Sequence, residues 1–193
     1  METNNTYTAF SGTKLLLSGD IKSIVLESKK HLDSGDNAAL LIFDDRTGKQ
    51  VDFDLRGTPE DVLRKLPAHP LFTPKEEATT PRTGPGRPKL GIVCREISLL
   101  PRHWEWLEQQ PQGASGTLRK LVEEAKRRDP DKEHARKARD AAGNFMWAMS
   151  GNLPGFEEAS RALYAGDVNK LEELTKEWPK DVRDYAMRLL QGS

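Results

Sequence analysis

The sequence predicts an α+β protein. A small N-terminal antiparallel sheet with helices should precede a proline-rich linker, a strand–helix–helix module and a C-terminal helical bundle. Three observations predict this order. Short apolar runs separated by turn residues fill the start of the chain, six of the 12 prolines fall between Pro67 and Pro88, and apolar residues then recur at helical spacing. We therefore place the regions at 1–66, 67–89, 90–128 and 129–193.

The N-terminal region begins with a predicted hairpin and a helix. Two apolar-rich runs, at 6–10 and 14–18, are separated by Ser-Gly-Thr, which is a typical hairpin turn. Asp20 is a good N-cap for the helix that follows, because its carboxylate can accept from the free N–H groups of the first turn. Gly35 is the expected end of that helix.

A second hairpin and helix are predicted next. AALLIF is a continuous apolar run, and Val51, Phe53 and Leu55 alternate with polar residues after the loop DDRTGKQ. Thr58 followed by proline predicts the start of another helix. The expected order is ββαββα, with helices on one side of the sheet. We interpret four carboxylates of this hairpin as residues of a solvated turn and a polar strand face: Asp44, Asp45, Asp52 and Asp54.

The linker is basic where it meets the central module. Residues 81–128 hold 10 basic and 5 acidic residues, although the whole chain balances 30 against 30. The segment PGRPKLG resembles the minor-groove hook of chromatin proteins, in which an arginine beside proline enters the narrow groove. The resemblance implies that Arg87 enters the groove while Arg82 and Lys89 meet phosphates. The alternative is a plain basic linker.

The central module is a predicted strand followed by two helices. In CREISLLP, Ile97 and Leu99 lie on one face of a strand, with Glu96 and Ser98 on the other. Pro101 suits the first turn of a helix that turns Trp104 inward. After Gly113, a second helix is expected with an N-cap at Ser115 and an apolar stripe that starts at Leu118.

This order resembles the ribbon-helix-helix family of dimeric repressors and antitoxins. The resemblance implies that two chains pair their strands, with the dimer interface at Ile97, Leu99, Trp104 and Leu118. It also implies that the strand meets DNA through Arg95, Glu96 and Ser98. The second helix would offer backbone N–H groups to a phosphate at Ser115, Gly116 and Thr117. The sequence departs from the family at Glu96, because basic or amide side chains are usual on that face.

The last region is predicted to be helical throughout. Asp129-Pro130 is a typical helix start, and Gly151 should end that helix. A second helix is expected over 154–165, closed by Gly166, and a third should be capped by Asp167. Pro179 should start the last one.

Several classes of function are not expected. Cys94 is the only cysteine, so no disulfide or cysteine zinc cluster can form within the chain. The four histidines are scattered without ligand spacing, and we expect neither a metal site nor a cofactor. No nucleophile, base and orienting acid can be assembled, so an enzyme is not expected. The N-terminus lacks a signal peptide and the longest apolar run is too short for a membrane, which predicts a cytoplasmic protein.

Four segments together resemble an uncharacterised bacterial family that is known only as a domain of unknown function. They are GRPKLGIVCREISLLPRHWEWL, GASGTLRKLVEEA, SGNLPGFEEASRAL and WPKDVRDYA, and the resemblance extends over nearly the whole chain. It implies a bacterial cytoplasmic protein and indicates nothing about a substrate.

Two functional hypotheses follow. The first is a homodimeric protein that binds duplex DNA, as a transcriptional regulator or an antitoxin-like factor. The second is a non-catalytic interaction module, in which the central strand and helices only dimerise and the C-terminal helices bind a protein partner. Binding to duplex DNA that falls steeply with salt would favour the first.

Overall fold

The computed structural model describes residues 6–36, 38–73 and 95–192. These residues fall into two compact units, which are described separately. The first joins the described residues of Met1–Phe72 to those of Asp131–Ser193, and the second lies within Thr73–Pro130. The predicted DNA contacts Arg82, Arg87 and Lys89, and the lone Cys94, lie outside the described residues.

A three-stranded antiparallel sheet forms the centre of the first unit. Its strands are β1 (Tyr7–Ser11), β2 (Lys14–Gly19) and β3 (Leu40–Asp44), in the order β2-β1-β3. The predicted first hairpin is confirmed, and so is the strand within AALLIF. All five residues of β1 are buried, since this strand has a neighbour on each edge and helices on each face.

The predicted fourth strand is wrong. Residues 51–55 form no strand, and pairing with β3 is limited to an isolated bridge between Phe43 and Gln50 and a hydrogen bond from the N–H of Val51 to the carbonyl of Ile42 at 2.8 Å. Instead, Phe53 packs its ring against Tyr7, at a centroid distance of 6.4 Å, and against His69 at 4.7 Å. The alternation of apolar residues therefore reflects a covering segment rather than a strand.

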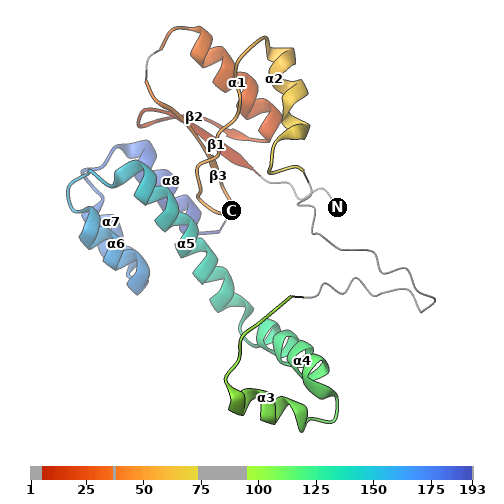
Figure 1. The fold of residues 1–193 in the computed structure, drawn as a ribbon. Coiled ribbons are helices and arrows are strands. Elements are labelled where there is room, and N and C mark those ends of the chain that lie inside the picture. The colour runs from red at the N-terminus through yellow and green to blue at the C-terminus, as the bar shows by residue number, and fades with distance from the viewer. Residues whose placement is uncertain (1–5, 37, 74–94, 193) are drawn as a thin grey trace. The chain divides into compact units, whose positions relative to one another are not determined.

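Two helices cover one face of the sheet (Figure 1). Helix α1 (Ile21–Asp33) starts at its predicted cap, where the Asp20 carboxylate accepts from the backbone N–H groups of Lys22 and Ser23. Helix α2 (Pro59–Lys65) starts with a capping box between Thr58 and Asp61, and a short 3-10 helix, η1 (Leu66–Ala68), follows it. Ile24 on α1 packs against Tyr7, Ala9 and Ile42 of the sheet.

The C-terminal residues form four helices whose ends were largely predicted. They are α5 (Pro130–Ser150), α6 (Phe156–Ala165), α7 (Val168–Leu174) and α8 (Lys180–Leu190). Gly166 ends α6 with a φ of 77°, a left-handed conformation that glycine adopts without strain. Asp167 caps α7 by accepting from the N–H of Lys170. Helix α6 starts two residues later than predicted, after the left-handed Gly155.

Helices α5 and α8 cover the second face of the sheet, whereas the sequence predicted helices on one side only. Phe10 and Phe43 of the sheet pack on Phe145 of α5, at centroid distances of 5.5 and 4.9 Å. Tyr185 of α8 completes the cluster, 4.5 Å from Phe145. Residues 1–66 and 129–193, which we separated in the sequence, therefore contribute to one core. The physical reason is that β1 carries apolar side chains on both faces.

A buried polar network joins α8 to the sheet. The Asp45 carboxylate accepts from the Thr8 hydroxyl and from the Tyr185 phenol, both at 2.7 Å. Arg188 donates to Thr8 Oγ1 at 2.8 Å and lies 3.7 Å from Asp45. Burial, together with the negative charge of Asp45, raises the pKa of the Tyr185 phenol well above its usual range. Asp44 and Asp45 are thus buried structural groups, which corrects their interpretation as solvated turn residues.

The second unit contains a helical hairpin. Helix α3 (Pro101–Glu108) and helix α4 (Gly113–Arg128) pack together, which confirms the predicted order of helix, turn and helix. Pro101 occupies the first turn of α3, as expected. Among the described residues of this unit, Leu107 and Thr117 are the buried ones.

Candidate functional site

The predicted DNA-contacting strand is not a strand within the single chain. Residues 95–100 form neither helix nor strand, and Arg95, Glu96 and Ser98 are exposed. Of the predicted interface residues nearby, Ile97 is 50% exposed and Leu99 is half-buried. Because a ribbon of this family forms between two chains, the paired strand stays a prediction.

The predicted phosphate contact at the start of α4 needs a correction. The helix begins at Gly113, two residues before the expected cap, and no side chain caps it. Ser115 is exposed in the first turn, whereas Thr117 is buried in the second turn, where N–H groups bond to carbonyls four residues back. The predicted interface residues Trp104 and Leu118 are half-buried in the hairpin. The three predicted N–H donors are therefore not equally available to a phosphate.

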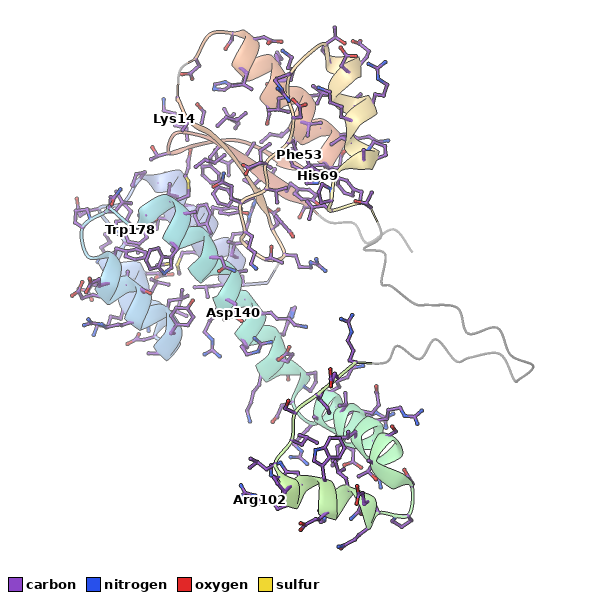
Figure 2. The ribbon with its side chains drawn as sticks, in the orientation of Figure 1. Lys14, Phe53, His69, Arg102, Asp140 and Trp178 are labelled. Carbon is purple, nitrogen blue, oxygen red and sulfur yellow. The ribbon has the colours of Figure 1, made fainter. Side chains whose placement is uncertain are left out.

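The first unit has a groove that the sequence did not predict. It has a volume of about 570 Å³ and lies between the loop after β3, helix α5 and helix α6. Asp140, labelled in Figure 2, marks the wall formed by α5. Four cations and one carboxylate line the groove, together with neutral and polar side chains: Arg46, Thr47, Lys49, Arg136, Lys137, Asp140, Ala141, Asn144 and Tyr164.

The loop after β3 is held against α5 by its own hydrogen bonds. The Asp44 carboxylate accepts from the N–H of Arg46 at 2.9 Å and from the Thr47 hydroxyl at 3.1 Å. Asn144 of α5 donates from Nδ2 to the carbonyl of Thr47 at 2.9 Å. These bonds fix the backbone on which Arg46 and its neighbours stand.

Glycine is required where the loop meets the helix. Gly48 has a φ of 63°, and a Cβ built there would overlap the carbonyl oxygen of Ala141. A second close approach lies on the α6 side, because a Cβ at Gly143 would overlap the hydroxyl of Tyr164. Only the Gly48 contact strictly requires glycine, because it is made with the backbone of Ala141, whereas the exposed Tyr164 side chain can move.

The groove carries unbalanced positive charge. Arg136 pairs with Asp140 and with Glu133, each at 2.8 Å, and Lys137 lies 3.5 Å from Glu133. Hydrogen bonds from Arg136 lower the pKa of Glu133, so this acid is ionised at neutral pH. Arg46 and Lys49 are exposed, and the described residues give neither of them an ion pair. Guanidinium, ammonium and phenol donors around one hollow can hold an anion.

The sequence shows one part of this site. The loop DDRTGKQ has Arg46 and Lys49 on opposite sides of Gly48, and it forms a tight turn after β3, as predicted, with the N–H of Asp44 bonded to the carbonyl of Lys49 at 3.0 Å. What completes the site is α5, whose contact residue Asn144 lies 97 positions after Thr47. A contact of that separation leaves no local pattern in a single sequence.

We also searched the described residues for membrane-spanning helices and for metal sites. No helix there is long and apolar enough to cross a membrane. No three histidine, cysteine, aspartate or glutamate side chains of the described residues are grouped so that they could hold a metal ion.

Comparison with known proteins identifies the family alone. No curated protein and no solved structure matches the chain. One family model matches residues 6–190, which is nearly the full length, in agreement with the resemblance seen in the sequence. The chain therefore belongs to the family described as an uncharacterized protein conserved in bacteria (DUF2239).

Proposed function

We propose that this protein is a cytoplasmic DNA-binding protein whose groove between the β3 loop and α5 holds the phosphate backbone. The observation that carries the proposal is the pair Arg46 and Lys49, which stand exposed and without an acidic partner among the described residues, beside Arg136 and Lys137. Most contacts between proteins and DNA go to phosphate and sugar oxygens, and they come from such side chains and from tyrosine and asparagine.

The balanced charge of the whole chain is compatible with this proposal. Phosphate contacts depend on cations gathered at one place, and each neutralised phosphate releases counterions. A net charge of zero removes long-range attraction, so we expect modest affinity that falls steeply with salt. Reading of base sequence would need other residues, and Arg95, Glu96 and Ser98 are the exposed side chains that the ribbon-helix-helix resemblance assigns to it. In that case the protein acts on duplex DNA as a regulator or an antitoxin-like factor.

Fluorescence anisotropy with labelled duplex DNA at several salt concentrations tests the proposal. Replacing Arg46 and Lys49 together by alanine should weaken binding and reduce the slope of log affinity against log salt by about 1.8, the value for two lost phosphate contacts. The matched control is Lys22→Ala with Lys30→Ala, which removes the same charge from exposed positions on α1. Equal slopes for all three proteins, or equal losses in both variants, would contradict a phosphate site in the groove.

The linker contacts are tested in the same assay. Replacing Arg87 and Lys89 by alanine should also weaken binding and flatten the salt slope, because both are predicted to lie near phosphates. Unchanged binding would remove the linker from the model and would leave the groove as the proposed contact.

A second candidate function is supported by the helical hairpin. Five large apolar side chains in the hairpin or just before it are 42 to 56% exposed, and exposed apolar surface marks sites of protein contact: Ile97, Leu100, Trp106, Leu121 and Val122. This observation favours an interaction module, either a homodimer or a complex with another protein. It is the preferred function if the full-length protein binds no DNA at low salt.

A further inference from the structure

The face of α5 that lines the groove also carries an exposed tryptophan. Arg136, Asp140 and Asn144 are spaced four residues apart, and Trp147 follows after three more, so all four lie on one face of the helix. The first three line the groove, and Trp147 stands one turn beyond it. The rise from Arg136 to Trp147 is about 16 Å, which is several times the ~3.4 Å of helix axis that each phosphate of one strand occupies in duplex DNA.

Trp147 is the most exposed of the large apolar side chains that the structure describes. It is 70% exposed, and Tyr164, which lines the groove, is 53% exposed. The edge-on ring of Phe156, at a centroid distance of 5.6 Å and an interplanar angle of 78°, supports Trp147 from one side. A supported, exposed ring near a groove lined by four cations is suited to stacking against a flat aromatic partner.

We propose that the cationic groove and Trp147 together form a site for single-stranded nucleic acid, with phosphates on Arg46 and Lys49 and an unpaired base stacked on Trp147. The inference rests on the proposed function, since it specifies which form of nucleic acid the same groove binds. A paired base inside a duplex cannot offer its face to a side chain, whereas every unpaired base can. A protein surface is the other common partner of an exposed tryptophan, and the adjoining cations favour nucleic acid over it.

Anisotropy titrations with four probes of about 16 nucleotides test the inference. The probes are oligothymidylate, oligouridylate, an abasic oligonucleotide of equal charge, and a duplex of mixed sequence. The single strands with bases should bind more tightly than the abasic strand and the duplex. A difference between oligothymidylate and oligouridylate would show whether DNA or RNA is the preferred source of the strand.

Variants of Trp147 separate stacking from charge. Trp147→Ala should weaken binding of the single strands by about 5- to 150-fold, the loss typical of one stacked base, and leave the abasic strand unaffected. Trp147→Phe should restore much of the affinity. Phe72→Ala, which removes another exposed aromatic ring of the first unit outside the groove, is the matched control. Thermal unfolding of each variant checks that it is folded, and the exposure of Trp147 predicts little change.

Failure of this inference can be told apart from failure of the proposed function. One outcome would be that all probes bind alike, that Trp147→Ala has no effect, and that the double variant of Arg46 and Lys49 binds more weakly than the wild-type protein. The stacking site would then be wrong, and the phosphate groove would stand. If the wild-type protein binds none of the probes at low salt, both proposals are wrong.

Discussion

The two units of the chain differ most in how much of their apolar surface is buried. In the first, the sheet is covered on both faces, and Phe10, Phe43 and Phe145 are fully buried. In the second, Leu107 and Thr117 are the buried residues among those described, while Leu121 and Val122 on α4 are exposed. The comparison teaches that the first unit buries its apolar side chains in a core of its own, whereas the second leaves large apolar side chains exposed.

The largest loss of stability is expected when a cavity is made in the core of the first unit. Phe145→Ala should reduce the free energy of unfolding by about 3–5 kcal/mol, since it removes a ring that contacts Phe10, Phe43 and Tyr185. Urea unfolding followed by circular dichroism measures the change. Leu121→Ala in α4 is the counterpart and should change stability by less than about 0.5 kcal/mol. Similar losses in the two variants would contradict the proposed difference between the units.

The close approach of the β3 loop to α5 gives the next largest effect. Gly48→Ala combines a left-handed backbone with an overlap at the Ala141 carbonyl. Gly35→Ala shares the positive φ, at 82°, but meets open space. The strain shared by both is about 1–2 kcal/mol, and we expect Gly48→Ala to exceed Gly35→Ala by about 1–3 kcal/mol in urea unfolding because of overpacking.

The same pair of variants links the loop to the groove. Gly48→Ala should also weaken DNA binding, because Arg46 and Lys49 flank the displaced residue, whereas Gly35→Ala should not. Normal stability and normal DNA binding in Gly48→Ala would show that the loop does not need its contact with α5.

Removal of the Tyr185 hydroxyl should have an intermediate effect. Tyr185→Phe leaves the buried Asp45 carboxylate with one donor fewer, which should cost about 1–3 kcal/mol at neutral pH. Thermal or urea unfolding measures the difference. A loss below the experimental error would mean that Arg188 and Thr8 alone satisfy this carboxylate.

The pH dependence gives a second measurement on the same tyrosine. The folded-state pKa of Tyr185 is raised above its ordinary value of 10.0, so its contribution to stability is complete below about pH 10. Above that pH the unfolded chain ionises this phenol first, and the stability of the wild-type protein should fall as the pH rises. Tyr185→Phe should show a flatter decline between neutral pH and pH 11, and equal declines would place the alkaline loss on other groups.

The smallest effect on stability is expected for a substitution in the second unit. That substitution tests instead whether two chains associate. Ile97→Asp changes a half-exposed side chain and should alter the stability of the chain by less than about 0.5 kcal/mol. If two chains pair through this segment, the buried carboxylate should dissociate the dimer, as measured by analytical ultracentrifugation. A variant that remains dimeric would argue against the paired strand, and a monomeric wild-type protein would argue against the dimer itself.

Local signals in the sequence were enough to determine most helix boundaries. Asp20, Thr58 and Asp167 cap helices as predicted, and Gly166 ends one, because a cap is a contact between residues only a few positions apart. Prediction was less accurate at Ser115, where a plausible cap lies inside the helix. The predicted strand over 51–55 was wrong, because apolar alternation also suits a segment that covers a core without pairing.

The sequence by itself therefore determined the α+β class, the family and the ends of the helices. The tertiary structure decided that the C-terminal helices share a core with the N-terminal sheet, through Phe10, Phe145 and Tyr185. It also decided that Gly48 meets Ala141 and so brings Arg46 beside α5. The physical reason is distance along the chain. Capping is local, whereas the contact of Gly48 with Ala141 spans 93 positions and that of Phe10 with Tyr185 spans 175, and only packing selects such contacts.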